Sequence, residues 1–397
     1  MIFLKFLPRT WAEINIDNLE HNYCVIRSML CDDVKYYAVV KADAYGHGAM
    51  YVIPEMQKFG VDGFAVSNIQ EAMQIRELGI DNDILILGYT PPELAKMLYD
   101  NNISQAVFDY DYAENLSKYA LENDVEIKAH IKIDTGMGRI GFVHRSFDDN
   151  TAINEITKVC NFGGINPVGV FMHFCTSDKD GDENGEFTDF QYALFADALN
   201  KLKANGIEFE IKHCCNSAAT LNNKKYHMNA VRPGIIMYGL EPSNAFRNFA
   251  DLKPSMKLKS VVSMVKTIHK DDSVSYGRTF VSNGEVKVAT IPVGYADGYP
   301  RSLSNKGYVL INGEKANIVG RICMDQMIVD VTNIKDVHSG SEVILFGEDG
   351  LTVEEFSSMC DTINYETVCV VGKRVPRVYI KNGKIIGQLN YVYNGKL

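Results

Sequence analysis

Residues 35–48 read KYYAVVKADAYGHG. The apolar and aromatic run from Lys35 to Val40 is typical of a buried strand, and Lys41 stands at its end, before a loop of small residues. Partial burial at a strand end lowers the pKa of a lysine amine, and a free amine can condense with an aldehyde. A single lysine at such a position more often has no catalytic role, so evidence from the rest of the sequence is needed to assign one to Lys41.

Further apolar runs rich in β-branched residues follow the first one, which spans 35–41. They lie at 62–67, 84–88, 104–108, 126–134, 167–174, 208–214 and 229–233. Helical patterns separate them, and eight β/α repeats predict a closed (β/α)8 barrel of the TIM type. An open doubly wound sheet is the alternative, but it would want a G-x-G-x-x-G fingerprint after its first strand, and that fingerprint is absent.

Three helix signals accompany these repeats. Asp17 is placed to cap a helix with an apolar face, and Thr90-Pro91-Pro92-Glu93 has the form of a capping box with proline at the first helical position. Residues 187–205 are amphipathic and stop at Gly206, which predicts a helix followed by a C-terminal glycine.

The pattern changes near Phe249, where the apolar runs become short and alternating. Asn-Gly pairs, which are hairpin signals because both turn residues tolerate positive φ, stand at 283–284, 312–313, 382–383 and 394–395. We therefore expect a barrel over 12–248 and a mostly β domain over 249–397, with residues 1–11 packed on the second domain.

The composition limits the possible partners. The net charge of −10 argues against nucleic acid and anionic membranes, and no apolar stretch is long enough to span a bilayer. Lys5 and Pro8 interrupt the opening MIFLKFLP, so we expect no signal peptide. Nine cysteines without a C-x-x-C pair are typical of reduced thiols, which indicates a cytoplasmic protein, and we expect no metal site.

Polar residues stand where the predicted strands end. They are Lys41, Arg139, His173, Asn216, Ser217 and Arg232. In a barrel of this type these positions face one common mouth. Each residue alone has an ordinary interpretation, such as a core histidine at 173 or a structural ion pair at 232. Their joint placement at strand ends favours a site.

The predicted seventh and eighth strands are followed by Ser217 and by Gly234-Ile235. Phosphate groups tend to bind at this place in such barrels, on backbone N–H groups and a hydroxyl. An amine after the first strand together with a phosphate site after the last two indicates pyridoxal phosphate (PLP), with Lys41 at its aldehyde carbon.

At this point the motifs resemble those of alanine racemases, which are PLP enzymes with a barrel and a β domain. The resemblance covers essentially the whole chain. The matching motifs are VVKADAYGHG (39–48), KIDTGMGRIG (132–141), MHF (172–174), NSAA (216–219), VRPGIIMYG (231–239), SYG (275–277), IPVGYADGYPR (291–301), GRICMDQ (320–326), INYE (363–366) and RVPR (374–377).

The resemblance implies a role for each matching residue. Lys41 would hold the coenzyme and act as one catalytic base, and Tyr276 would be the opposite base. Arg232 would face the pyridine nitrogen, and His173 would link Arg232 with Tyr276. The residues implied to bind the cofactor are Lys41, Tyr45, Arg139, His173, Asn216, Ser217, Arg232, Gly234, Ile235 and Tyr365.

The substrate pocket is implied by the same resemblance. Arg139, Met324 and Asp325 would border the substrate, and Tyr295 and Arg301 would line the entrance. One further position, Lys132, matches a lysine that is often carbamylated in this family, where the carbamate orients the arginine at 139.

Elementary chemistry supports two bases. Racemisation removes a proton from one face of Cα and returns one to the other face, and one base cannot easily serve both faces of a rigidly held carbon. Because a guanidinium does not give up its proton, Arg232 would leave the pyridine nitrogen unprotonated and make the ring a weaker electron sink. That favours quick reprotonation over transamination.

The partner implied by the family is a second copy of the chain. In that family the tyrosine reaches the site from the other subunit, so we expect a homodimer with composite active sites at which a small amino acid binds. Alternatives stay open: a serine or broad-spectrum amino-acid racemase on the same fold, and a PLP-binding carrier without turnover. One hydroxyl or methylene changes discrimination by only about 1–3 kcal/mol, so the sequence leaves the preferred amino acid undecided.

Overall fold

The computed structural model describes residues 8–179 and 181–393, which form two compact units. The first, here called the barrel unit, comprises Glu20–Ala44 and Val52–Lys253. The second, here called the β unit, comprises the described residues of Met1–Leu19, Tyr45–Tyr51 and Pro254–Leu397. The boundaries expected from the sequence, 12–248 and 249–397, stay a prediction.

The barrel unit contains a closed barrel of eight parallel strands, as predicted. Its strand order is β5-β4-β3-β2-β10-β9-β8-β6, and a parallel pairing of β5 with β6 closes the ring. The strands are β2 (Lys35–Val39), β3 (Gly63–Val66), β4 (Asp83–Ile86), β5 (Ile103–Val107), β6 (Ile127–Asp134), β8 (Ile165–Phe171), β9 (Ile211–Cys215) and β10 (Ala230–Val231), with β7 (Phe142–Val143) beside β6. Each of the eight predicted runs therefore overlaps a barrel strand, although the ends differ by a few residues.

The strands are buried on both faces, which explains their continuous apolar sequence. All residues of β3 and β5 are buried, and parallel sheets covered by helices have this pattern. Each fully buried valine or isoleucine side chain contributes roughly 1.5–3 kcal/mol to folding. The polar residues that interrupt the pattern near strand ends are therefore the exceptions that need an explanation.

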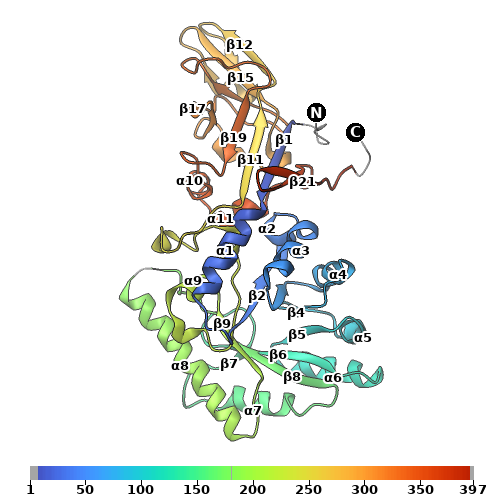
Figure 1. The fold of residues 1–397 in the computed structure, drawn as a ribbon. Coiled ribbons are helices and arrows are strands. Elements are labelled where there is room, and N and C mark those ends of the chain that lie inside the picture. Colours follow the sequence, from blue (N-terminus) through green and yellow to red (C-terminus); the bar gives the residue numbers. More distant parts are fainter. Residues whose placement is uncertain (1–7, 180, 394–397) are drawn as a thin grey trace. The chain divides into compact units, whose positions relative to one another are not determined.

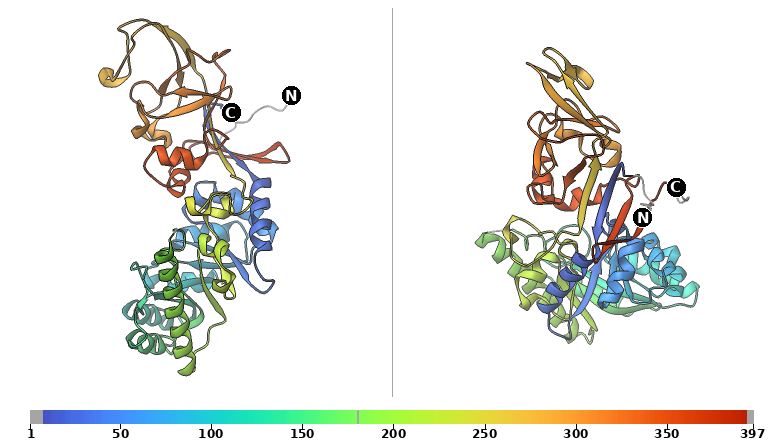
Figure 2. Two further views of the ribbon diagram at one scale, coloured as in Figure 1. Left: turned by 90° about the vertical axis from the view of Figure 1, so that its left-hand side faces the viewer. Right: turned by 45° about the horizontal axis from the view of Figure 1, so that its top comes forward.

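Helices lie on the outside of the barrel strands, as Figures 1 and 2 show for α4 to α8. The helices of the barrel unit are α4 (Ile69–Glu77), η1 (Pro92–Leu94), α5 (Ala95–Asp100), α6 (Tyr110–Glu122), α7 (Thr151–Val159), α8 (Asp182–Ala204), α9 (Ser217–Asn222), η2 (Lys224–Tyr226), η3 (Ile235–Tyr238) and η4 (Asn244–Phe246). In α7 the buried side chains are Ala152, Ile153, Ile156 and Val159, the spacing of one apolar helix face. Three further helices contain residues of both units: α1 (Ile16–Ser28), α2 (Lys41–Tyr45) and α3 (Ala49–Phe59).

The helix signals have mixed outcomes. The helix expected over 187–205 is α8, which ends at Ala204 before Gly206, where φ is 82°. The prediction that Asp17 caps a helix is wrong, because α1 begins at Ile16 and Asn15 Oδ1 accepts the bond from Asn18 N at 3.0 Å.

The predicted capping box at Thr90 is also wrong. The helix η1 begins at Pro92 after Pro91, which has an extended ψ of 129°, and it has no side-chain cap. The Thr90 hydroxyl is buried with no partner among the described residues. The two prolines add one extended residue between the threonine and the helix, so the hydroxyl does not cap the helix.

The β unit is built mostly from antiparallel strands around one large sheet, in which only the pairing of β1 with β20 is parallel among the described strands. That sheet has the order β17-β16-β19-β11-β1-β20-β21, beside a three-stranded sheet β12-β15-β18 and a pair β13-β14. The strands are β1 (Thr10–Asn15), β11 (Met256–Val261), β12 (Met264–Ile268), β13 (Ser273–Val274), β14 (Phe280–Val281), β15 (Val286–Ile291), β16 (Tyr308–Ile311), β17 (Glu314–Asn317), β18 (Met327–Asp330), β19 (Glu342–Phe346), β20 (Arg377–Lys381) and β21 (Lys384–Leu389). Its helices are η5 (Tyr276–Arg278), η6 (Tyr295–Asp297), η7 (Arg301–Leu303), α10 (Val353–Met359) and α11 (Asn364–Cys369). The prediction of a mostly β C-terminal domain is confirmed.

Two of the Asn-Gly pairs form the predicted hairpins. Asn312-Gly313 joins β16 to β17 with φ values of 53° and 79°, and Asn382-Gly383 joins β20 to β21 with φ values of 51° and 68°. The hairpin predicted at 283–284 is wrong, because this pair lies between β14 and β15, which belong to different sheets. The pair at 394–395 lies outside the described residues, as does most of the opening MIFLKFLP.

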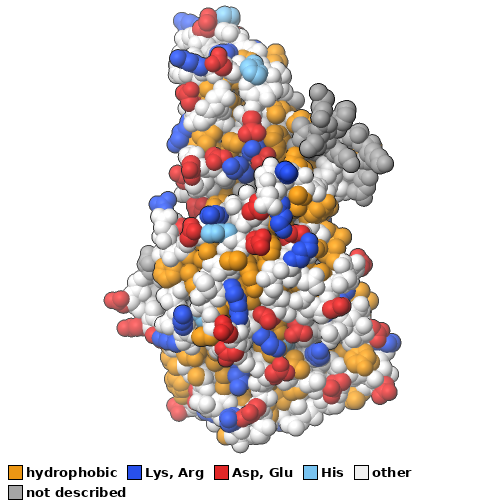
Figure 3. Space-filling view, viewed as in Figure 1, with side chains coloured by type: hydrophobic (Ala, Val, Ile, Leu, Met, Phe, Trp, Pro, Cys, Tyr) orange, Lys and Arg blue, Asp and Glu red, His pale blue; other side chains and the backbone are white. Residues whose placement is uncertain are grey.

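The surface carries charges of both signs. On the face shown in Figure 3, Lys and Arg side chains are interspersed with Asp and Glu side chains. Of the helices in the described residues, none combines the length and the apolar character that a membrane crossing requires.

Candidate active site

The predicted site residues of the barrel unit follow the strand ends. Lys41 comes two residues after β2 and opens a left-handed turn, in which Ala42, Asp43 and Ala44 have φ values of 54°, 56° and 53°. A left-handed turn costs roughly 1–2 kcal/mol for each residue with a Cβ. Strain of this kind persists only where the surroundings hold it, and it is concentrated at functional sites.

One carboxylate holds the start of this turn. Glu71 on α4 accepts a bond from Ala42 N through Oε1 and from Ser67 N through Oε2, both at 2.8 Å. Ala44 N donates to Val40 O at 2.9 Å. Glu71 thus joins the backbone after β2 to the backbone after β3 and fixes the residue that follows Lys41. No motif in the sequence pointed to Glu71.

Arg232, directly after β10, is buried at the centre of a polar cluster. Its Nη2 donates to Met172 O at 2.9 Å and to Cys214 O at 3.3 Å, and lies 3.5 Å from His173 Nδ1. Burial lowers the pKa of Arg232 to about 10, so the side chain is still a cation at neutral pH. The guanidinium is therefore fixed in place and faces the end of the barrel where His173 lies.

Two histidines extend this cluster into the barrel. Arg232 Nη1 donates to His213 Nδ1, and His213 Nε2 lies 2.9 Å from His130 Nδ1. Burial, followed by the charge of Arg232, lowers the pKa of His130 to about 3 and the pKa of His213 well below its usual value. Both imidazoles are neutral, and because arginine can only donate, His213 must accept at Nδ1 and donate from Nε2 to His130. The donor direction of Arg232 therefore fixes the tautomers of both rings.

His173 is neutral as well. Burial lowers its pKa well below the usual value, and the charges of Arg232, Lys132, Arg139 and Lys41 lower it further. The charged side chains predicted for the site in the barrel unit therefore all lie within electrostatic reach of His173.

Lys132 on β6 is a buried lysine. Its Nζ donates to Ile133 O at 3.1 Å and lies 5.2 Å from the centre of the Phe171 ring. Burial lowers its pKa to about 7, with a further contribution from the charge of Arg232. An amine with this pKa is neutral in about half of the molecules at neutral pH, which a carbamylation reaction requires.

The ends of β9 and β10 form a small backbone cradle. The buried Ser217 Oγ accepts from Gly234 N at 2.9 Å, and Asn216 caps α9 by accepting from Ala219 N at 3.0 Å. Ser217 opens α9 and Ile235 opens η3, and the first N–H groups of a helix have no partner within it. Two helix starts and a hydroxyl suit a phosphate. The predicted residues Ser217, Gly234 and Ile235 are thus brought together.

The side chains of this region fit PLP. The cations Lys41, Lys132, Arg139 and Arg232 act on one partly buried imidazole, and an anionic coenzyme offsets their mutual repulsion. The nearby carboxylate Asp134 is bound to the amides of a glycine turn and to Arg145 Nη2 at 2.5 Å. Among the described residues, no group of three or more His, Cys, Asp or Glu side chains could hold a metal ion.

The other predicted residues belong to the β unit. Tyr45 is buried, and its ring centre lies 6.3 Å from that of Tyr365 on α11. Tyr276 opens η5 in a turn with positive φ at Ser275, Gly277 and Arg278, and its side chain is 71% exposed in the single chain. These are the positions to which the resemblance assigns phosphate binding and the second base.

Three of the predicted entrance and substrate residues, Tyr295, Met324 and Asp325, lie in two segments that contact each other. Tyr295 N donates to Cys323 O at 3.1 Å, and Ala296 N donates to Met324 O at 3.0 Å. Asp325 pairs with Arg374, and the exposed Arg301 opens η7. Arg374 opens the RVPR motif, but the motif alone gave it no role.

A barrel with a lysine at one strand end, buried cations beside it and a phosphate cradle at two others defines the class of PLP-dependent barrel enzymes. Family models for the N-terminal domain and the C-terminal domain of alanine racemase match residues 14–242 and 255–379. The chain belongs to the alanine racemase family, a family of PLP-dependent racemases that interconvert L- and D-alanine. The resemblance stated from the motifs is confirmed.

Several relatives match over their full length. The alanine racemase of Clostridium tetani is 43% identical over 98% of this chain and 100% of its own, and alanine racemase 1 of Clostridium acetobutylicum is 44% identical with the same coverage. Among solved structures, alanine racemase of Clostridium difficile 630 has a TM-score of 0.92 at 38% identity, over 99% of this chain and 100% of its own. The Bacillus anthracis enzyme with bound L-Ala-P has a TM-score of 0.91 at 34% identity, over 98% and 99%.

Proposed function

We propose that this chain interconverts L- and D-alanine with Lys41 and Tyr276 as its two bases. The observation that carries the proposal is the full-length match to alanine racemases together with the presence of both residues, one in each unit. When bound, PLP acidifies the Cα–H bond of an amino acid joined to it by withdrawing electrons from Cα. Everything else has to be done by the side chains of the protein.

The residues proposed to hold PLP divide by the part of the coenzyme that they suit. Lys41 offers its amine to the aldehyde carbon, and Arg232 offers a fixed N–H to the pyridine nitrogen. The proposed phosphate ligands are Tyr45, Ser217, Gly234, Ile235 and Tyr365, and Asn216 supports them by capping α9. Arg139, oriented by Lys132, suits the ring oxygen and the substrate carboxylate because guanidinium binds carboxylates with two parallel bonds.

In the proposed proton transfer, one base acts on each face of Cα. In one direction Lys41 Nζ accepts the Cα proton and Tyr276 Oη donates its own proton to the opposite face; in the other direction the roles reverse. The substrate inverts, and each turnover leaves the two bases with exchanged protonation states, which proton exchange with water resets. Because Arg232 keeps its proton, it would leave the pyridine nitrogen of bound PLP unprotonated and make the coenzyme a weaker electron sink, which favours quick return of a proton to Cα.

We further propose a homodimer in which Tyr276 serves the site of the other copy. In the single chain the side chains of Tyr276, Met324 and Tyr295 are exposed by 71%, 52% and 44%, which is unusual for residues that handle a small substrate. A second copy would cover them. We also propose that the enzyme works in the cytoplasm and that its D-alanine serves peptidoglycan.

The primary test is a racemisation screen over L-Ala, L-Ser, L-Lys and L-Arg with PLP-loaded protein. We expect loss of optical activity with L-alanine well above that with the other three. No racemisation of any of them would refute the proposal, and a higher rate with L-serine would replace alanine as the substrate.

The two bases and the shared site are tested by complementation. Lys41→Ala and Tyr276→Phe should each be inactive, while Tyr99→Phe, which alters another exposed tyrosine, should keep full activity. Mixed heterodimers of the two inactive variants should recover part of the activity, because one of their two sites has both bases. No recovery after verified subunit exchange would contradict a composite site.

A further inference from the structure

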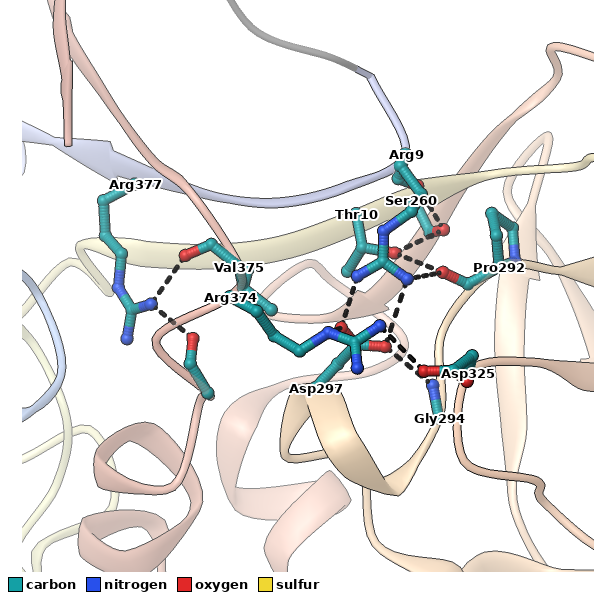
Figure 4. A network of polar contacts seen from close by, with 11 residues as sticks. Arg9, Thr10, Ser260, Pro292, Gly294, Asp297, Asp325, Arg374, Val375 and Arg377 are labelled. Carbon is teal, nitrogen blue, oxygen red and sulfur yellow. Dashed lines mark hydrogen bonds and ion pairs between the residues drawn. The ribbon is translucent and has the colours of Figure 1, made fainter. Parts of the chain in front are cut away.

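The β unit contains an ionic hub around the buried Asp297, and of its members only Asp325 has a role above. It consists of Asp297, Arg9, Arg374 and Asp325 and is here called the Asp297 hub. Figure 4 shows the guanidinium groups of Arg9 and Arg374 directed at the carboxylate of Asp297. Asp297 is 1% exposed, and it accepts from Arg9 through both carboxylate oxygens and from Arg374 Nε at 3.0 Å.

The hub balances its own charge. Two guanidinium groups on the single carboxylate of Asp297 would leave one positive charge over, and Asp325 Oδ1 offsets it by pairing with Arg374 Nη2 at 2.8 Å. Arg374 is therefore shared between a buried and an exposed carboxylate, in the fork geometry for which arginine is suited. Removing a partner of a buried charge is costly, because the remaining charge is left uncompensated.

The hub also fixes the turn that carries Tyr295. Asp297 Oδ2 accepts from Gly294 N at 3.0 Å, and Asp297 O accepts from Gly372 N at 2.8 Å. This turn is joined to the segment 323–325 by the two backbone bonds described above. At Gly294 the two backbones come so close that a Cβ would lie 2.2 Å from Cys323 O. The turn and the segment therefore form one rigid layer.

The layer in turn holds the residue before Tyr276. Ser275 Oγ donates to Arg321 O at 2.5 Å and lies 3.4 Å from Cys323 Sγ. At Gly320 a Cβ would lie 2.8 Å from Val274 O, so these two segments are also in close contact. A continuous set of short contacts thus leads from Arg374 through 323–325 to the backbone of Tyr276.

We propose that Arg374 is a positioning residue for the racemisation, because it clamps Asp297 to Asp325 and so fixes both Met324-Asp325 and the phenol of Tyr276. This inference rests on the proposed function. It makes a specific claim: loss of Arg374 impairs the proton transfer of Tyr276 and leaves the proton transfer of Lys41 intact. General destabilisation would impair both transfers equally.

The test measures the two transfers separately in D₂O. Starting from the enantiomer whose proton Lys41 removes, the readout is the ratio of Cα–H exchange with retained configuration to inversion. Arg374→Met should raise this ratio about tenfold or more, since a displacement of about 1 Å of a catalytic group can cost about a hundredfold in rate. Arg374→Lys, which keeps the charge but lacks the fork, should give an intermediate value.

A matched control comes from the same unit. Lys259 bridges Glu13 and Glu342 at 3.1 and 3.2 Å, and Lys259→Met removes this second bridge between two carboxylates. It should leave the ratio unchanged. An independent readout without turnover is amide hydrogen exchange, which should accelerate at 321–325 and 275–277 in Arg374→Met and not in Lys259→Met.

The outcomes separate this inference from the proposed function. Tyr276→Phe must raise the exchange ratio, and wild-type protein must racemise alanine; failure of either refutes the proposed function. If both hold, an unchanged ratio in Arg374→Met, or unchanged amide exchange at 321–325, overturns the positioning role of Arg374.

Discussion

Replacing Lys132 by methionine should stabilise the protein, and the gain should shrink as the pH rises. The folded protein holds the pKa of Lys132 at about 7, against an ordinary value of 10.5. At about 1.4 kcal/mol per pKa unit, keeping the buried ammonium costs the folded state about 5 kcal/mol below pH 7. Methionine has a similar length and no charge, so it removes this cost.

The sign follows from proton linkage. Between about pH 7 and 10.5 the unfolded chain binds a proton at Lys132 that the folded protein does not, so folding stability rises with pH across this window. From about pH 6 to about pH 9 the wild type should gain about 3 kcal/mol relative to Lys132→Met. Below the folded pKa the difference between the two proteins should be constant.

The assay is urea unfolding of both proteins at these two pH values in buffer depleted of CO₂, so that no carbamate forms. Lys128→Met is the control, because Lys128 lies on the same strand but is exposed, and its effect should be the same at both pH values. If the stability difference between wild type and Lys132→Met does not change with pH, burial of this amine does not lower its pKa and the reasoning is refuted. If it does change, ¹³C-labelled bicarbonate should give a carbamate signal that Lys132→Met lacks.

Three further changes test the site and its support. Ser217→Ala should weaken PLP binding about tenfold in an absorbance titration, because one hydroxyl hydrogen bond is worth about 1.4 kcal/mol here and Gly234 N also loses its partner. An unchanged affinity would contradict a phosphate site at Ser217. Gly46→Ala should lower the free energy of unfolding by about 3 kcal/mol or more, because φ is 77° and a Cβ would lie 2.1 Å from Val368 O. The control is Gly79→Ala, which should lower it by only about 1 kcal/mol, because φ is similar at 73° but no described atom lies within 4 Å of the added Cβ. Ala42→Gly should raise the unfolding temperature by a few degrees, since glycine adopts positive φ without steric cost; a fall would show that this turn is not strained.

The barrel could be predicted because the burial of its strands determines the pattern of apolar residues in the sequence. A strand covered on both faces needs a continuous apolar run, and eight such runs with helices between them leave few alternatives to a closed ring. The hairpin signals are less reliable because an Asn-Gly pair specifies a turn and not a pairing. Asn283-Gly284 has the right residues, but its flanking strands find partners in different sheets.

Site residues could be predicted where their role follows from their position at a strand end. They could not be predicted where the role depends on contacts with residues elsewhere in the sequence. Lys41, Ser217 and Arg232 follow strand ends, so topology alone brings them to one mouth. Glu71 and Arg374 escaped notice because their roles come from carboxylate and guanidinium contacts to distant backbone and side chains. His130 did leave a signal, since it precedes Lys132 by two residues on one strand and therefore points to the same side.

The polar interior of the barrel mouth connects stability with coenzyme binding. Three imidazoles, those of His130, His173 and His213, are kept neutral by burial and by the charge of Arg232, and Lys132 lowers the pKa of the last two further. Any anion that binds at the mouth reduces this repulsion, and by linkage the same interaction raises the pKa of Lys132 and strengthens the fold. A carbamate on Lys132 would replace the ammonium by an anion and so reduce the repulsion from within the protein, and the phosphate and ring oxygen of PLP would reduce it from outside. The excess of positive charge at the mouth therefore lowers the stability of the barrel, and the same charge suits an anionic coenzyme and a substrate with a carboxylate.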